Sequence, residues 1–347
     1  MLQISTQTKI YIYCPAGAVT GGAELLHQMA HILRSENMNA YVVYYGDKEH
    51  AKPAEYNCYN VEITEHVEDI HQNIEVIYEG VFHFIPQHKQ TQKLLWWLSV
   101  DHFYMCAAPY LSLCDLARWN CKMAAKAFLR RAYNLVFNGG KKSFFNTFSI
   151  QDLRKMSAMH GYQSEYAQNF LQNKGFGELV ALKDYINTDH VTPFSIEGRE
   201  DIVLYNPKKG MKFTQKLINA APNIRWVALQ NMTRTELVDL MRRSKLYVDF
   251  GYHPGKDRLP RECAMNGCCI ITGKRGSAAF FEDIAIGDNY KFDEHRSSVH
   301  SIIERVQDVL RNYQTAIDDF AYYRAAISRE KIEFEEQVKN LFCNNVK

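Results

Sequence analysis

The side chains best suited to chemistry lie in one loop and the start of the next helix, over residues 251–262. Three of them are basic and could bind phosphate: Lys256, Arg258 and Arg261. The carboxylate of Glu262 could accept hydrogen bonds from two neighbouring sugar hydroxyls. An apolar run over 246–250 comes before this loop, and open α/β sheets bind ligands at the carboxyl ends of their strands. The pattern predicts a nucleotide-sugar site, while exposed salt bridges and a helix-dipole role for Glu262 are the ordinary alternatives.

Two more loops at the ends of predicted strands carry basic or small residues. Residues 206–210 read Asn-Pro-Lys-Lys-Gly, and three of them could hold a diphosphate beside a helix terminus: Asn206, Lys208 and Lys209. Residues 273–277 read Gly-Lys-Arg-Gly-Ser, in which Gly276 and Ser277 could contact the same ligand. A solvated surface turn is the alternative for each loop alone. Together the three loops indicate nucleotide phosphate binding in the second half of the chain.

The first loop, over residues 16–24, has glycines where a strand turns into a helix. Gly21 and Gly22 would let the backbone approach a ligand and present free N–H groups to an anion. Their spacing, Gly-x3-Gly-Gly, differs from the Gly-x-Gly-x2-Gly fingerprint of dinucleotide sites. A tight turn needed only for packing is therefore the alternative.

Residues 96–102 (WWLSVDH) end a predicted strand in the first half of the chain. Trp97 could stack on an acceptor sugar beside Ser99, and Asp101 or His102 could deprotonate or orient an acceptor hydroxyl. A core tryptophan and a structural histidine are the alternatives.

Four basic residues recur at every fourth position of a predicted helix: Arg118, Lys122, Lys126 and Arg130. Apolar residues lie beside them, so the helix could rest on anionic lipid as a peripheral membrane contact. The solvated outer face of an ordinary helix is the alternative.

Two alternating series of strands and helices are expected to position these residues. The first has strands over 9–14, 40–45, 75–78, 94–99, 135–138 and 179–182. The second has strands over 201–205, 224–229, 246–250 and 268–272, helices over 213–221 and 234–243, and a helical tail from about residue 297. Each strand–helix–strand unit indicates a parallel sheet, and the polar segment 187–200 predicts a linker. We expect a first Rossmann-like domain over 1–186, a second over 187–325, and a C-terminal helix over 326–347.

The composition limits the class of protein. The 347 residues suffice for two domains, and a net charge of +2 gives no reason to expect a nucleic-acid partner. Nine scattered cysteines contain no Cys-x2-Cys pair, so neither a disulfide framework nor a zinc site is expected. The sequence shows no signal-peptide pattern and no stretch near the ~20 apolar residues of a membrane span. We expect a soluble, cytoplasmic protein with reduced thiols.

Four segments resemble the GT-B, group 1 (family 4-like) class of nucleotide-sugar glycosyltransferases. Residues 19–33 (VTGGAELLHQMAHIL) are similar to its Gly-Gly-x-Glu turn, and residues 205–210 (YNPKKG) to its Lys-Gly phosphate turn. Residues 160–171 (HGYQSEYAQNFL) are similar to its Ser-x-Tyr and Phe-Leu run, and residues 261–273 (RECAMNGCCIITG) to its Glu-Ala-Met-Ala-x-Gly-x-Pro-Val-Ile signature. The resemblance implies an α/β fold of two Rossmann-like domains that face each other across a cleft, with a C-terminal helix returning to the first domain.

The resemblance also implies roles for particular residues. Glu262 would bind the nucleotide ribose, Lys209 would contact the diphosphate, and Gly21 and Gly22 would approach the donor phosphates or the acceptor.

The chain departs from the family at Pro254, eight positions before Glu262, where the family has an acid that contacts the transferred sugar. Asp257 is the nearest carboxylate that could replace it. The family's arginine before the phosphate lysine is also missing, and Arg258 could supply its charge.

These features predict an enzyme that transfers a sugar from a nucleotide diphosphate donor, such as a UDP- or GDP-sugar, to a glycan or lipid-linked acceptor. The resemblance implies retention of configuration, no obligatory metal or other cofactor, and a role in bacterial surface polysaccharide synthesis at the inner face of the plasma membrane. Two alternatives stay open. His253-Pro254 resembles the His-Pro element of CMP-sugar transferases, and the chain could be a non-catalytic nucleotide- or sugar-binding protein.

Overall fold

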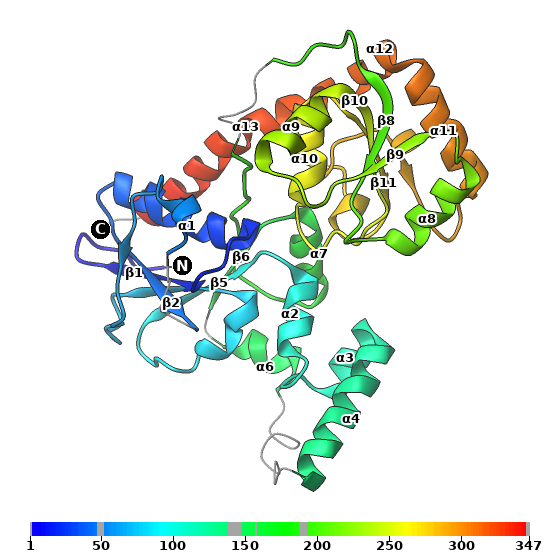
Figure 1. The fold of residues 1–347 in the computed structure, drawn as a ribbon. Helices are drawn as coiled ribbons and strands as arrows, with labels where there is room; N and C mark the ends of the chain where they lie inside the picture. Colours follow the sequence, from blue (N-terminus) through cyan, green and yellow to red (C-terminus); the bar gives the residue numbers. More distant parts are fainter. Residues whose placement is uncertain (1, 47–51, 138–147, 157, 188–192, 345–347) are drawn as a thin grey trace. The chain divides into compact units, whose positions relative to one another are not determined.

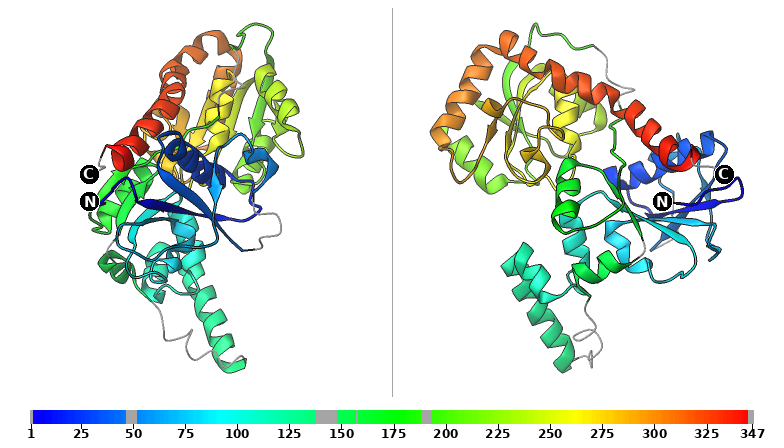
Figure 2. Two further views of the ribbon diagram at one scale, coloured as in Figure 1. Left: turned by 90° about the vertical axis from the view of Figure 1, so that its left-hand side faces the viewer. Right: turned by 180° about the vertical axis from the view of Figure 1, so that it is seen from behind.

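The computed structural model describes residues 2–46, 52–137, 148–156, 158–187 and 193–344. The chain divides into two compact units, each with its own parallel β-sheet (Figures 1 and 2). Unit 1 comprises residues 1–163, 167–182 and 335–347, and unit 2 comprises residues 164–166 and 183–334.

Unit 1 contains seven parallel strands in the order β3-β2-β1-β4-β5-β6-β7. They are β1 (Lys9–Pro15), β2 (Asn39–Tyr45), β3 (Glu62–Ile63), β4 (Ile74–Tyr78), β5 (Gln92–Trp97), β6 (Met159–Tyr162) and β7 (Leu179–Ala181). The helices that accompany them are α1 (Gly21–Ser35), α2 (Val100–Ala107), α3 (Leu113–Trp119), α4 (Cys121–Phe137), α6 (Ile150–Lys155), α7 (Glu165–Asn173), and the 3-10 helices η1 (Ala54–Tyr56) and η2 (Glu79–Phe84). Ile12 of β1 pairs with Val42 of β2 on one side and Val76 of β4 on the other, so the strand order reverses at β1.

Unit 2 contains five parallel strands in the order β12-β11-β10-β8-β9. They are β8 (Glu200–Tyr205), β9 (Arg225–Ala228), β10 (Ser244–Asp249), β11 (Cys269–Gly273) and β12 (Lys291–Phe292). The helices that accompany them are α8 (Met211–Ala220), α9 (Arg234–Arg243), α10 (Arg258–Met265), α11 (Val299–Arg311), α12 (Tyr313–Ala316), and the 3-10 helices η3 (Ser277–Ala279), η4 (Asp288–Tyr290) and η5 (Ile317–Phe320). Helix α13 (Ala321–Val338) begins in unit 2 and ends in unit 1, to which the π-helical η6 (Lys339–Cys343) also belongs.

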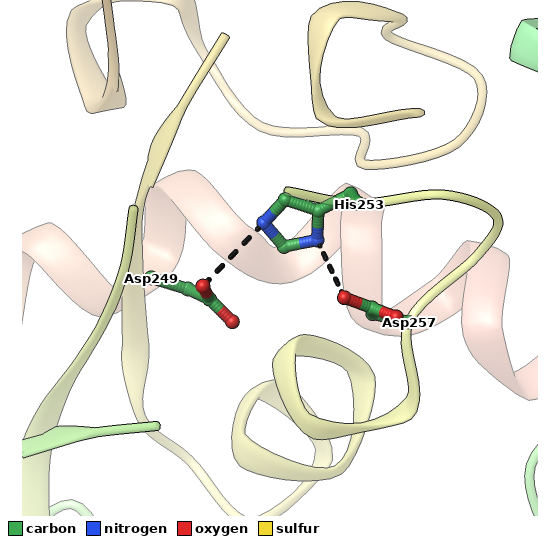
Figure 3. Close-up of side chains that lie close together, drawn as sticks. All are labelled: Asp249, His253 and Asp257. Atoms are coloured by element: carbon green, nitrogen blue, oxygen red, sulfur yellow. Dashed lines mark ion pairs between the residues drawn. The ribbon is translucent and has the colours of Figure 1, made fainter. Parts of the chain in front are cut away.

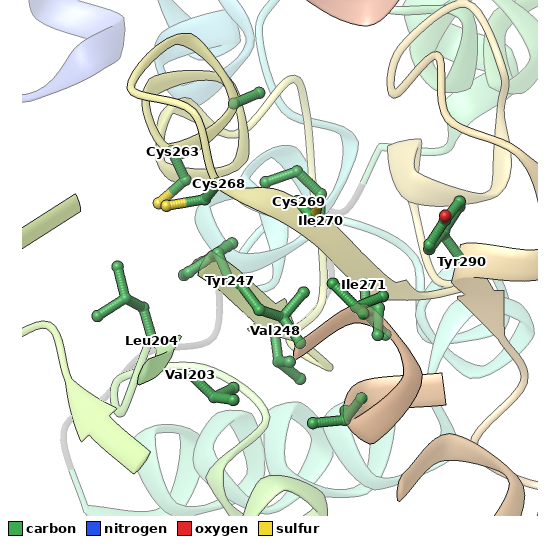
Figure 4. Close-up of a cluster of buried hydrophobic side chains, with 14 of the residues drawn as sticks. Val203, Leu204, Tyr247, Val248, Cys263, Cys268, Cys269, Ile270, Ile271 and Tyr290 are labelled. Carbon is green, nitrogen blue, oxygen red and sulfur yellow. The ribbon is translucent and has the colours of Figure 1, made fainter. Parts of the chain in front are cut away.

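The core of unit 2 forms around its central strands. Val203 and Leu204 of β8, Val248 of β10, and Ile270 and Ile271 of β11 are completely buried (Figure 4). Figure 1 shows α9 and α10 on one side of this sheet and α8 and α11 on the other. A parallel sheet covered on both faces buries every side chain of its inner strands, which explains why these strands read as continuous apolar runs.

One strand prediction is wrong. The apolar run from residue 135 does not form a strand, because residues 135–137 are the last residues of α4 and residue 138 lies outside the described part of the chain. A short apolar run fits a strand or a helix equally well, and here the preceding helix continues through it. β3, β6 and β12 were not predicted, since each is short and contains polar or glycine residues.

All nine cysteines have free thiols. None of the helices in the described ranges is long and apolar enough to cross a membrane.

Candidate functional site

Two loops of unit 2 meet at the point where its strand order reverses. β8 lies between β9 and β10, so the chain turns toward one edge of the sheet after β8 and toward the other after β10. The loops after these strands, 206–210 and 250–257, therefore border the crevice where open α/β sheets bind ligands. Gly210 has a φ of 65°, and a Cβ there would lie 2.3 Å from the carbonyl oxygen of Phe250. The close approach of the two loops thus requires glycine at this position.

Lys209 and Asp257 connect these two loops. The Nζ atom of Lys209 donates to both carboxylate oxygens of Asp257, each at 2.8 Å. The Oδ2 atom of Asp257 also lies 3.0 Å from Nδ1 of His253, and Nε2 of this ring lies 3.7 Å from Oδ1 of Asp249 (Figure 3). The hydroxyl of Tyr247 donates to Oδ2 of Asp249 at 2.6 Å. We call the series Lys209–Asp257–His253–Asp249 the charge chain.

His253 is the buried centre of the charge chain. Both of its ring nitrogens face a carboxylate oxygen, whereas a neutral imidazole has only one N–H. Burial of the ring lowers the pKa of His253, but the charges of Asp249 and Asp257 raise it more, so the pKa lies above its ordinary value. Burial raises the pKa of Asp257, yet the neighbouring His253 and Lys209 lower it below its ordinary value. Both shifts favour the charged forms, a cationic ring and an anionic Asp257 carboxylate.

Asp249, His253 and Asp257 are close enough together to be considered as a metal site, with one ligand atom from each within 4.8 Å of the others. The imidazole lies between the two carboxylates, however, and each carboxylate faces a different ring nitrogen (Figure 3). Lys209 also contacts both oxygens of Asp257. The geometry fits a series of ion pairs better than a metal centre.

Gly276 and Ser277 hold the loop that carries His253. The backbone N–H of Ser277 donates to the carbonyl oxygen of His253 at 2.8 Å, and its hydroxyl donates to the carbonyl oxygen of Gly255 at 2.6 Å. Gly276 has a φ of 61°, and a Cβ there would lie only 1.9 Å from the His253 carbonyl oxygen. These residues, which were predicted to bind the donor, therefore position the charge chain.

Lys256 and Arg261 have partners inside unit 2. Lys256 Nζ lies 2.7 Å from a carboxylate oxygen of Glu330. Arg261 donates to both oxygens of Asp184 at 3.0 and 2.8 Å, and to Glu330 at 2.8 Å. Both cations are buried. Their charges are neutralised within the protein, so neither cation is available to a phosphate in this structure.

Glu262 lies in the second turn of α10, whose N-cap residue is Asp257. Its Oε2 accepts a hydrogen bond at 2.8 Å from Arg234, the first residue of α9, and the sequence analysis had not singled out this arginine. Glu262 is almost completely buried, and Arg258, at the start of α10, is half-buried. The capping box formed by Thr233 with a glutamate three residues later sets the start of α9 and so the place of Arg234.

The loop after β8 is held by its own side chains. The Oδ1 atom of Asn206 accepts a hydrogen bond at 3.0 Å from the backbone N–H of Lys208, whose side chain is exposed. Asn206 thus shapes the turn that delivers Lys209 to Asp257, as asparagine does in many turns.

In unit 1 the corresponding reversal of strand order lies between β1 and β4. Thr20 caps α1 through its hydroxyl oxygen, which accepts from the N–H of Ala23 at 3.2 Å. Gly21 and Gly22 form the first turn of this helix. A Cβ at Gly22 would meet Leu98 at 3.6 Å, an ordinary contact, so packing inside unit 1 does not require glycine there.

Trp97 is not available to stack on a sugar. It is completely buried, its ring packs against Phe103 and Phe170, and its indole N–H donates to Nδ1 of His160 at 3.2 Å. Ser99 caps α2, because its hydroxyl oxygen accepts from the backbone N–H of His102 in the first turn. The core position that the sequence left as an alternative is the one observed for this tryptophan.

His102 and Asp101 lie in the first turn of α2 and have protein partners. His102 Nδ1 lies 3.1 Å from Oε1 of Glu79, and its Nε2 lies 3.3 Å from the sulfur of Cys106. These two contacts outweigh burial and raise the pKa of His102 to about 10. The ring is then already protonated at neutral pH, so it could orient an acceptor hydroxyl but could not take its proton. Asp101 is buried and accepts a hydrogen bond at 3.2 Å from the indole of Trp119.

The predicted basic stripe lies on the exposed side of α3 and α4. Arg118, Lys122, Lys126 and Arg130 are all exposed. Large apolar side chains of α4 are exposed as well: Phe128, Leu129, Tyr133, Val136 and Phe137. Ala124, Ala127 and Arg131 form the buried side of the helix. Successive residues of an α-helix are rotated by 100° about its axis. Most of the exposed apolar side chains of α4 therefore lie on the same face of the helix as its basic residues.

The sequence matches no known family model and no curated protein at a significant level. Solved structures are similar in fold. Sucrose-phosphate synthase from Thermosynechococcus elongatus aligns with a TM-score of 0.62 at 10% identity, over 96% of this chain and 98% of that one. Anabaena HepE in complex with UDP and glucose aligns with a TM-score of 0.58 at 12% identity, over 96% and 99%. WaaG, a glycosyltransferase involved in lipopolysaccharide biosynthesis, aligns with a TM-score of 0.55 at 11% identity, over 95% and 99%. The two α/β units therefore have the GT-B fold of nucleotide-sugar glycosyltransferases.

Proposed function

We propose that the protein is a retaining glycosyltransferase that moves a sugar from a nucleotide diphosphate donor to a glycan or lipid-linked acceptor in bacterial surface polysaccharide synthesis. The observation that carries the proposal is the position of Lys209 and Glu262. In a unit of GT-B fold, Lys209 follows one of the two strands at which the strand order reverses, and Glu262 lies in the helix that follows the other. An ammonium and a carboxylate suit the two ends of a nucleoside diphosphate, since one attracts phosphate and the other accepts hydrogen bonds from ribose.

The donor site in this proposal belongs to unit 2. Glu262, held by Arg234, accepts hydrogen bonds from the ribose hydroxyls. Lys209, the half-buried Arg258 and the N–H groups at the start of α8 stabilise the negative charge that develops on the leaving diphosphate. We propose no obligatory metal ion, because these positive groups can supply the charge that a metal would otherwise supply.

The acceptor side of the proposal rests on unit 1. Gly22 lies in the first turn of α1 at the strand reversal, where nothing in the packing demands glycine. His102, cationic and half-buried, could donate a hydrogen bond to an acceptor or donor oxygen. The exposed basic and apolar face of α4 is proposed to rest on the anionic inner face of the plasma membrane.

Thermal unfolding with a panel of UDP, GDP, ADP and CMP tests the donor class. A nucleotide that binds only the folded state at 100 times its Kd stabilises it by about 2.7 kcal/mol. We expect stabilisation by one or more nucleoside diphosphates, followed by sugar transfer when the matching nucleotide sugars are supplied. Stabilisation by CMP alone would favour a CMP-sugar transferase, and nucleotide binding without any transfer or donor hydrolysis would favour a binding protein.

The CMP-sugar alternative loses its main support in the structure. It depended on His253 next to Pro254, but His253 has no exposed surface and contacts Asp249 and Asp257. A side chain in that position cannot touch a nucleotide monophosphate directly.

A further inference from the structure

We propose that His253 is a positioning residue of the donor site, which takes over the Asp257 carboxylate when Lys209 turns to the diphosphate. The inference rests on the proposed function, because it requires a diphosphate at Lys209. It assigns a purpose to a fully buried histidine that no ligand can reach.

The need for such a residue arises from the pairing of Lys209. Its ammonium lies 2.8 Å from both oxygens of Asp257, so an internal anion already balances the charge that should attract phosphate. Asp257 is itself mostly buried. If Lys209 left for a phosphate, a poorly solvated carboxylate without a counter-ion would remain, which is strongly unfavourable.

His253 removes this cost. Its Nδ1 lies 3.0 Å from Oδ2 of Asp257, the oxygen that Lys209 also contacts. The carboxylate therefore keeps one cation when the other departs. Asp249 stabilises the positive ring from its opposite edge at 3.7 Å, and Tyr247 holds Asp249 in place. The release of Lys209 from Asp257 therefore costs less free energy than it would if the side chain at position 253 were neutral.

The charged groups around His253 make the binding of a diphosphate depend on pH. Asp249 faces the ring from β10, Asp257 from the start of α10, and Lys209 from the loop before α8. Ser277, the first residue of η3, donates to the backbone carbonyl oxygens of His253 and Gly255. When Lys209 leaves Asp257, a positive charge moves away from the ring and the ring holds its proton more tightly. Diphosphate binding should therefore take up protons, and it should weaken as pH rises.

The inference is tested by calorimetric titration of four versions of the full chain with UDP, GDP and ADP. They are the wild type, His253→Gln, Asp257→Asn and the double variant. Glutamine is close to histidine in size but carries no charge. We expect His253→Gln to weaken nucleotide binding about tenfold. Asp257→Asn should bind at least as tightly as the wild type, because Lys209 loses its internal anion. The double variant should bind like Asp257→Asn, since the carboxylate that His253 holds on the side of Lys209 is then already absent.

A histidine that only fills space would give a different result. His253→Gln would then weaken nucleotide binding by the same factor whether position 257 is Asp or Asn. That outcome would overturn the inference. His300→Gln is the matched control, because His300 also lies near a carboxylate of unit 2, Glu304, but is exposed. Its nucleotide affinity should equal that of the wild type.

The pH dependence needs no variant and covers the case in which His253→Gln fails to fold. Wild-type affinity should fall as pH rises above the phosphate pKa of about 6. Titration in buffers of different ionisation enthalpy should show proton uptake on binding. A wild type that binds UDP, GDP or ADP without proton uptake contradicts this inference alone, whereas a wild type that binds none of them contradicts the proposed function.

Discussion

Arg234 and Glu262 form an ion pair that joins the first turn of α9 to the second turn of α10, with Nη1 2.8 Å from Oε2. The arginine is about half exposed and the glutamate is nearly buried, so the pair holds the carboxylate at the border between the protein interior and solvent. A carboxylate fixed in this way is prepared to accept hydrogen bonds from a diol.

Glu262→Gln should reduce the preference for ribose over deoxyribose. A hydrogen bond to a charged group contributes about 1.5–3 kcal/mol, so nucleotide affinity should fall about 10- to 100-fold. Calorimetric titration with UDP and 2′-deoxy-UDP measures the effect, or the same pair built on whichever base the protein binds. The wild type should prefer the ribose form, and the variant should bind the two forms nearly equally. A variant that keeps the full preference would remove Glu262 from the ribose site.

Lys209→Ala should abolish most sugar transfer while the chain still folds. Loss of the ammonium removes a cation from the leaving diphosphate, and the removal of one charged group from such a site costs about 10²–10³ in kcat. Asp257 keeps His253 as a partner, so the thermal unfolding temperature should change little. Lys331→Ala, an exposed lysine of α13, is the control and should retain full activity. Equal activity in both variants would contradict the assignment of Lys209.

The sequence was sufficient to predict most strands of the two parallel series and the loops that border the candidate site, but not the short strands β3, β6 and β12. It could not show which side chains meet across these loops. Asp257 meets Lys209 because β8 and β10 are neighbours in the sheet, and Arg261 meets Asp184 from a distant segment. Pairings of this kind depend on strand order, which local residue patterns do not encode.

Residue type alone also left two roles open. Trp97 has a ring that suits either a sugar or a core, and only its neighbours on β6 and α7 determine that it is buried. Asp249 was not singled out, because it is the last residue of a buried strand. His253 was singled out only together with Pro254, as an element of another enzyme class, and not for its two neighbouring aspartates. A histidine with an aspartate four residues before it and another four residues after it was the signal that could have identified the charge chain.

Arg261→Met should destabilise unit 2. The arginine is buried and holds the carboxylates of Asp184 and Glu330, which would be left without this cation. Loss of one partner from a buried ion pair costs about 3–5 kcal/mol. Urea unfolding followed by the fluorescence of Trp226, the tryptophan of this unit, measures the change. Arg329→Met removes an exposed ion pair with Glu333 and should change the free energy of unfolding by less than about 0.5 kcal/mol.

His102 should make the protein less stable at alkaline pH. Its pKa is raised to about 10 in the folded state, against about 6.5 in an unfolded chain. The folded state therefore binds the proton more tightly, and the resulting stabilisation is complete below about pH 6.5 and lost as pH rises toward 10. Because this side chain is 41% exposed, solvent screening reduces the effect to about 1 kcal/mol.

Unfolding of the wild type and His102→Gln at pH 6.5 and pH 9.5 isolates this contribution. The difference in stability between the two proteins should be larger at the lower pH. The same difference at both pH values would show that the ring does not carry a raised pKa. Groups that titrate in both proteins cancel in the comparison.

Lys122→Glu combined with Lys126→Glu should release the protein from anionic membranes. Each basic residue near such a surface contributes about 1 kcal/mol, so loss of two positive charges alone should lower partitioning about 30-fold. Co-sedimentation with phosphatidylglycerol vesicles measures the change, with phosphatidylcholine vesicles as the neutral reference. Lys212→Glu with Lys216→Glu reverses two exposed charges at the same spacing on α8 and should leave vesicle binding unchanged. If the two double variants bind vesicles equally, the charges of α4 make no specific contribution to membrane binding. Their loss would then have the same effect as an equal change of net charge elsewhere on the protein.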